Sequence, residues 1–139
     1  MTISIAKDGV VLALPPDLVW TDELTWSAVS QSTERSITGA LLVDAMARSG
    51  GRPITLAGDG NSAWIVRSAL LTLKAWAAIP GQRFTLSVRG EVFTVIFDHG
   101  TEEETRALAM SAVVEYSDPK ATDYYCRLTL RFLEASDTP

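Results

Sequence analysis

The residues with reactive side chains are few and are spread along the chain. His99 is the single histidine and Cys126 the single cysteine. A histidine acts as a general base when it has a nucleophile in reach and a partner that orients it, whereas Asp98 points to the opposite face of an extended strand. We therefore interpret His99 as a solvated loop histidine and Cys126 as an inert core thiol on the apolar side of a strand.

Carboxylates are the other candidates for chemistry. Asp17, Asp22 and Glu23 have the residue types of a glycosidase pair, but such pairs are common on the surface of an acidic chain. Three consecutive glutamates at 102–104 follow His99, and their spacing fits no metal site. The turn at 58–60 has too few glycines, and no following lysine, for a phosphate loop. We expect no enzyme activity, no cofactor and no metal.

Length and composition limit the function further. A chain of 139 residues predicts one domain over 1–139. Its 47% hydrophobic content is high beside 21% charged residues, which indicates a well-filled core, apolar surface kept for subunit contacts, or both. A net charge of −5 argues against a general nucleic-acid binder. One cysteine excludes an internal disulfide, and we find no secretory signal or membrane-spanning run.

The stretch 53–98 organises the rest of the chain. Apolar runs at 53–56 and 63–66 flank a turn cluster and predict two strands. Ser68 is placed to cap a helix over about 68–78, which Pro80-Gly81 ends. Alternation at 84–88 and 93–97 then predicts a hairpin whose apolar face the helix covers.

Two registers remain open for this second hairpin. A turn at Arg89-Gly90 pairs Leu86 with Phe93, and a turn at Gly90-Glu91 pairs Leu86 with Val95. Both keep the same apolar face, because they differ by two residues.

The flanking segments also read as strands. Asp8-Gly9 predicts a hairpin arm within 1–16. Strands are expected over 28–37 and 41–47, broken near Gly39-Ala40; 41–48 has the propensity for two helical turns, but the flanking turn signals favour a strand. We expect turns at 49–51 and 117–120, a strand over 107–115, a solvated acidic segment at 101–104 and a flexible tail at 136–139. The final strand alternates most cleanly, with Tyr124, Cys126, Leu128, Leu130 and Phe132 on its apolar face.

Trp20 and Trp26 are six residues apart around Asp22-Glu23. In a helix they would lie on different faces, whereas two extended pieces would let them pack together. We favour anchors that hold a loop to the core over an aromatic platform for a sugar or a partner. The pattern of short strands with one packed helix predicts a mainly β (α+β) fold, an antiparallel sandwich or barrel.

Several segments together carry a resemblance to a known family. They are 14–23 (LPPDLVWTDE) with Trp26, 31–34 (QSTE), 39–41 (GAL), 51–56 (GRPITL), 63–65 (AWI), and Tyr125 with 127–134 (RLTLRFLE). They resemble small tail proteins of siphophages and prophages, and the strand arrangement resembles the tail-tube-like domain of tube, distal tail and tail-tip hub proteins. One departure is Arg89-Gly90, where family members often carry Asp-Gly.

The resemblance implies a virion protein made in the bacterial cytoplasm and assembled into a homo-oligomeric ring, a hexamer, around the tail channel. Its partners would be tube, tape measure and hub proteins, with no membrane anchor. DNA would pass without specific binding, as an acidic chain repels phosphates. Candidate subunit-interface residues are Arg127, Thr129 and Arg131 on the polar face of the final strand, with Trp20 and Trp26. The alternative is a carbohydrate-binding module that uses exposed tryptophans.

Overall fold

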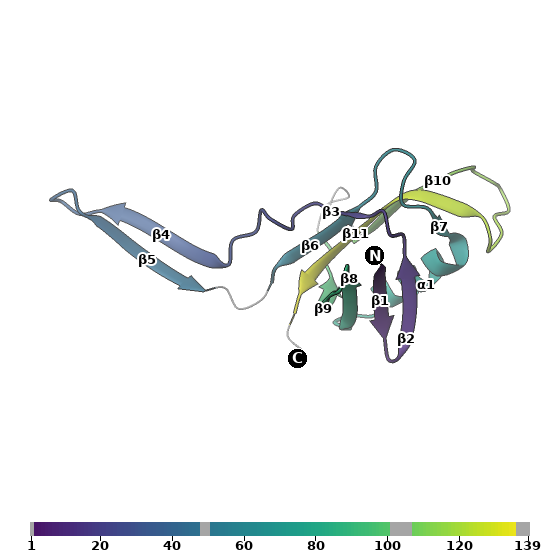
Figure 1. The fold of residues 1–139 in the computed structure, drawn as a ribbon, viewed down its shortest axis with the longest axis horizontal. Helices are drawn as coiled ribbons and strands as arrows, with labels where there is room; N and C mark the ends of the chain where they lie inside the picture. Colours follow the sequence, from purple (N-terminus) through teal and green to yellow (C-terminus); the bar gives the residue numbers. More distant parts are fainter. Residues whose placement is uncertain (1, 48–50, 101–106, 136–139) are drawn as a thin grey trace.

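The computed structural model describes residues 2–47, 51–100 and 107–135. These residues form a body, made of a sheet and one helix, and an arm, the hairpin of β4 and β5, which projects from the body (Figure 1). The elements in chain order are β1 (Ile3–Lys7), β2 (Val10–Leu14), β3 (Val19–Trp20), β4 (Val29–Arg35), β5 (Leu41–Ala47), β6 (Pro53–Ala57), β7 (Ile65–Val66), α1 (Arg67–Ala77), β8 (Phe84–Val88), β9 (Glu91–Phe97), β10 (Leu108–Ala112) and β11 (Tyr124–Glu134).

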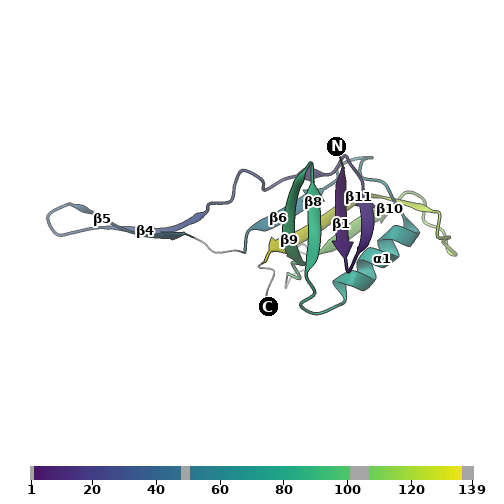
Figure 2. The same cartoon turned by 60° about the horizontal axis from the view of Figure 1, so that its bottom comes forward.

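The body is built on one antiparallel sheet of nine strands. Its main path runs β2-β1-β8-β9-β11-β6-β3, and β7 and β10 also pair with β11. In Figure 2 the group β2, β1, β8 and β9 stands at a steep angle to β6, β11 and β10. Buried side chains from both groups join in one hydrophobic core. The predicted mainly β fold with antiparallel pairing and one helix is therefore confirmed.

Two tight turns set the register of the first part of the sheet. Asp8 and Gly9 have φ values of 50° and 83°, and they close the predicted β1–β2 hairpin. β1 also pairs with β8, so this hairpin belongs to the sheet of the body and is not a separate arm. Arg89 and Gly90 have φ values of 48° and 90°. Leu86 lies opposite Phe93, which decides between the two registers in favour of the turn at Arg89-Gly90.

The last strand, β11, is the centre of the sheet. It pairs with β6 and β7 along one edge and with β9 and β10 along the other. Cys126, Leu128, Leu130 and Phe132 are buried, as the alternation predicts. Tyr124 was expected on the same face, but it lies at the start of the strand beyond the core and is 50% exposed. β10 is shorter than the strand expected over 107–115.

Helix α1 runs over nearly the predicted residues, but its first turn is held differently. The N-cap position is Val66, and Ser68 makes no side-chain cap. Instead the backbone N–H groups of Arg67 and Ser68 donate to the carbonyls of Asp123 and Ala121, at 2.8 and 3.1 Å. These long-range contacts satisfy helix donors that a side chain would otherwise have to satisfy, so the serine cap was the wrong prediction.

The apolar side of α1 closes the core. Leu70, Leu73 and Trp76 are buried. The Trp76 ring stacks on the ring of Phe84 in β8, with centroids 5.7 Å apart. This contact supports the prediction that the helix packs on the hairpin that follows it.

The arm confirms the strand interpretation of both its segments. β4 and β5 pair over their full seven residues, from Val29 opposite Ala47 to Arg35 opposite Leu41. The connecting turn is closed by the Ser36 N–H, which donates to the Ala40 carbonyl at 2.8 Å, with Gly39 at a φ of 86°. The helical alternative for 41–48 is wrong for the described residues.

Some expectations fall outside the described residues. They are the first two positions of the turn at 49–51, the acidic segment 101–104 and the tail 136–139.

Leu73 gives a direct test of the packing of α1. Its side chain is 0% exposed, so Leu73→Ala removes buried surface and leaves a cavity. We expect the free energy of unfolding to fall by about 2–5 kcal/mol, measured by urea denaturation. Leu71, on the same helix and 49% exposed, is the matched control. A loss at Leu73 as small as that at Leu71 would contradict the packing described for α1.

Candidate functional site

The arm presents two chemically different surfaces. Paired residues of an antiparallel hairpin place their side chains on the same side, so the register defines both faces. We call one the acidic face; it carries Ser30, Ser32, Glu34, Leu42, Asp44 and Met46. We call the other the apolar face; it carries Val29, Gln31, Thr33, Arg35, Leu41, Val43, Ala45 and Ala47.

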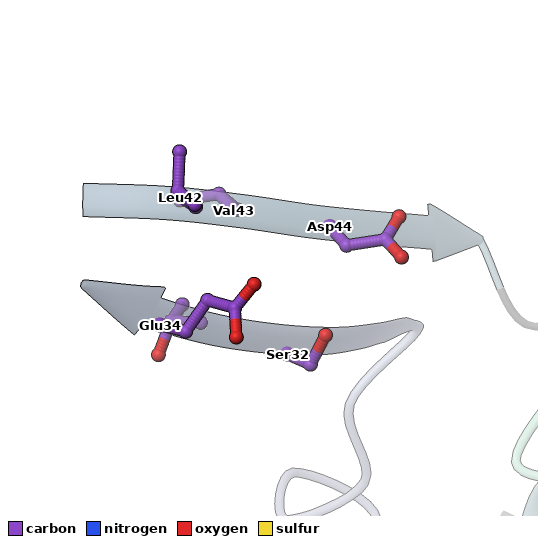
Figure 3. Close-up of a pocket in the computed structure, with 6 residues that line it drawn as sticks. Ser32, Glu34, Leu42, Val43 and Asp44 are labelled. Carbon is purple, nitrogen blue, oxygen red and sulfur yellow. The ribbon is translucent and has the colours of Figure 1, made fainter. Parts of the chain in front are cut away.

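A shallow hollow of about 240 Å³ lies between the strands of the arm, and residues of both faces line it: Ser32, Glu34, Leu42 and Asp44 of the acidic face, with Thr33 and Val43 of the apolar face. Figure 3 shows the carboxylates of Glu34 and Asp44 beside Ser32 in this hollow. Two carboxylates are too few to define a metal site, and the described residues contain no group of three or more His, Cys, Asp or Glu side chains that could hold a metal ion.

The apolar face has no cover within the described chain. All fourteen strand residues of the arm are exposed. Val29, Leu41 and Val43 expose 46, 53 and 55% of their surface. An isolated two-stranded hairpin is at best marginally stable in water, and contiguous exposed apolar surface is typical of interaction sites. The arm therefore has the properties of an element that binds another protein surface.

Near the base of the arm, an arginine is surrounded by aromatic rings. The guanidinium carbon of Arg52 lies 4.9 Å from the ring centroid of Trp20, 5.8 Å from that of Trp26 and 5.9 Å from that of Phe93. Its Nη2 donates to the Glu23 carbonyl at 2.9 Å. A cation above aromatic faces gains electrostatic energy, and more so when water is excluded. We call Arg52 and these three aromatic residues the arm root.

The contacts within the arm root indicate the role of Trp20 and Trp26. Trp20 is 6% exposed and belongs to the core, and Trp26 is partly buried. They meet through Arg52, which covers both rings. This agrees with anchors that hold a loop to the core and leaves no open platform at this pair. Their role as subunit-interface candidates stays a prediction.

The carboxylates considered for catalysis accept backbone hydrogen bonds instead. Asp22 accepts from the Thr55 N–H and from its hydroxyl, both at 2.9 Å, where the pairing of β3 with β6 ends. Asp17 accepts from the Ala63 N–H at 3.0 Å. His99 lies exposed after β9. Of the predicted chemical groups that lie in the described residues, none share a site.

The loop over 58–62 is hydrogen-bonded to β11 at Arg127, one of the interface candidates. Arg127 has a φ of 55°, beside a register shift between β10 and β11. Its N–H and its Nε donate to the carbonyls of Ser62 and Gly60, both at 2.9 Å. At Gly58 a Cβ would lie 2.3 Å from that of Ala63, so only glycine fits there. The Arg127 side chain thus holds the 58–62 loop.

Thr129 and Arg131 lie where β11 has partners on both sides. Thr129 is opposite Ala109 and Ala57. Arg131 is opposite Thr55, and its backbone also bonds to Ala107 and Asp98. Both side chains are half-buried. The backbone edges of β11 are therefore occupied, and its role as an interface remains a prediction that concerns side chains alone.

A second exposed apolar surface lies near the start of β11. Trp64, Tyr116 and Tyr124 expose 46, 55 and 50% of their surface. Val113 and Val114 beside them expose 40 and 53%. The rings of Trp64 and Tyr124 are 5.7 Å apart. We call these five residues the end patch; sequence reasoning missed it because Trp64, Tyr116 and Tyr124 come from separate segments that only the fold brings together.

No protein family model, curated protein or solved structure matches the chain.

Among the described residues, no helix has the length and apolar character required to cross a membrane.

Asp22 provides a test of how the arm is anchored. In Asp22→Ala, the part-buried Thr55 N–H and hydroxyl lose their acceptor, so we expect the free energy of unfolding to fall by about 1–3 kcal/mol. Glu23→Ala is the control, since the carboxylate of Glu23 accepts no hydrogen bond within the part of the chain that the structure describes. Equal stability of the two variants in urea denaturation would show that the Asp22–Thr55 pair does not hold this loop.

Proposed function

We propose that this chain is a structural protein of a bacteriophage tail, which forms a homo-oligomeric ring at the distal tail or baseplate around the tail channel. The ring would contain six copies, contact tube, tape measure and hub proteins, and reside in the virion. The family resemblance of segments such as 14–23 and 127–134 suggests this role. The observation that carries it is the arm.

The arm is the feature best explained by self-assembly. Each of the two strands contributes seven paired residues, and apolar side chains on both strands remain exposed. A monomer gains nothing from holding this surface in water. In a ring, each copy offers its arm to a neighbour, and the same contact repeats around the axis.

An open strand edge supports the same role. Among the described strands, β2 pairs only with β1. Its sequence VVLAL contains no charge and no proline, and Val10 and Val11 are 58 and 67% exposed. Proteins usually protect such edges with charges, prolines or bulges. An edge that a neighbour covers in the assembly needs no such protection.

The fold and charge are compatible with a wall around DNA. The two steeply crossing groups of strands, with α1 at one side, support a tail-tube-like sandwich as the finer description of the fold. A net charge of −5 disfavours binding to phosphates. DNA would therefore pass through such a channel without specific binding.

A pair of adjacent arm substitutions tests the proposal. Val43→Glu places a charge on the apolar face, and Leu42→Glu places one on the face that already carries Glu34 and Asp44. The two side chains are 55 and 48% exposed, so both variants should unfold at nearly the wild-type temperature. We expect Val43→Glu to abolish rings seen by native mass measurement and electron microscopy, whereas Leu42→Glu retains them.

Two results would contradict the proposal. If the wild-type chain stays monomeric at high concentration and alongside the other tail proteins, the ring proposal is wrong. If both variants form rings as the wild type does, the apolar face of the arm is not the contact.

A carbohydrate-binding module is the second candidate. Of the tryptophans considered for it, Trp64 alone is substantially exposed, and its ring lies beside that of Tyr124. Aromatic faces of this kind can stack on a sugar. Quenching of tryptophan fluorescence by a saccharide panel, lost in Trp64→Ala, would favour this function.

A further inference from the structure

The end patch and the arm lie at opposite ends of the molecule. Figure 1 sets the longest axis of the chain horizontally, with the arm at one extreme and β7, the start of β11 and the preceding loop at the other. Figure 2 shows the same separation after rotation. An elongated subunit with one unpaired apolar surface at each end has the form required for head-to-tail contact.

Two aromatic residues of the end patch, Trp64 and Tyr124, are held by a hydrogen bond and by strand pairing. The indole Nε1 of Trp64 donates to the Asn61 carbonyl at 2.6 Å. This bond fixes the ring on the 58–62 loop, which is hydrogen-bonded to β11. Tyr124 and Tyr125 pair with Val66 and Ile65, and the Tyr125 hydroxyl accepts from Arg67. A hollow of about 340 Å³, partly lined by Tyr116, Tyr124 and Val114, adjoins these rings. Rigid aromatic residues around a hollow are typical centres of protein interfaces.

The charges of the two surfaces are complementary. On the apolar face of the arm the single charged residue is Arg35. Its guanidinium donates to the Gly39 carbonyl at 3.1 Å and has further donors to offer. The segment 113–123 beside the end patch contains Glu115, Asp118 and Asp123 against Lys120 alone, a formal charge of −2. The acidic face of the arm would meet this segment with like charges, so one face of the arm is selected.

We propose that the apolar face of the arm of one copy docks on the end patch of a second copy. This inference rests on the self-assembly proposed above and names the surface that receives the arm. The contact is heterologous, because it joins two different surfaces of the same chain. It closes into a ring if each contact also rotates the next copy.

Paired cysteines test the contact directly. Thr33→Cys lies on the apolar face, Ser32→Cys lies on the acidic face of the same strand, and Val114→Cys lies in the end patch. All three positions are exposed, whereas native Cys126 is buried. We expect Thr33→Cys/Val114→Cys to give a ladder of crosslinked dimers, trimers and larger species with a short bis-maleimide. We expect Ser32→Cys/Val114→Cys, each single variant and the wild type to give no ladder.

A charge exchange supplies a second readout that does not depend on the cysteines. Arg35→Glu should weaken assembly, and Glu115→Arg in the same chain should restore it, because the opposite charges then face each other in reversed positions. Both positions are exposed, so neither change should lower the temperature of unfolding.

The possible results test the docking inference separately from the ring proposal. Dimers from Thr33→Cys alone would mean that arms pair with arms, and rings without a ladder would mean that the arm docks elsewhere. Either result overturns the inference and leaves the ring proposal intact. Absence of both crosslinks and rings overturns both. Saccharide binding at Trp64 without any ladder would assign the end patch to a ligand and overturn the inference as well.

Discussion

The body depends on the pairing of β11. Its eleven residues hydrogen-bond to four other strands, so each of its edges serves two partners in turn. Antiparallel strands this far apart in sequence pair only after long loops have closed, and the entropy of closure must be offset by burial. Leu128, Leu130 and Phe132, all at 1% exposure or below, supply that burial. The strand that comes last in the chain therefore completes both halves of the core.

The arm follows a different rule from the body. Every strand of the body sheet contributes at least one residue that is buried in the core or packed against it. The arm has hydrogen bonds between its strands and no buried strand residue. Near its base lies the arm root, where Arg52 is held between rings and by the Glu23 carbonyl. The hydrogen bonds between β4 and β5 thus set the shape of the arm, and the body holds the residues near its base. This division suits an element whose remaining contacts are made with another molecule.

Much of the fold could be predicted because its signals are local. Asp8-Gly9 and Arg89-Gly90 require positive φ at adjacent positions, and alternation along 84–97 and 124–134 shows which side is buried. The surfaces proposed for assembly could not be predicted in this way. The exposure of β4 and β5 depends on the tertiary structure, since among the described strands they pair only with each other. The end patch collects residues from separate segments, namely Trp64, Val113, Val114, Tyr116 and Tyr124. The cap at Ser68 failed for the same reason, since carbonyls of 121 and 123 take its place.

Because the arm is long, a small change of angle at the arm root would move its tip by a large distance. Seven extended residues span roughly 23 Å at about 3.3 Å each, so a tilt of about 10° at Arg52 would move the tip by about 4 Å on that length. In the ring proposed above, the angle at the base of the arm would set the curvature of the assembly.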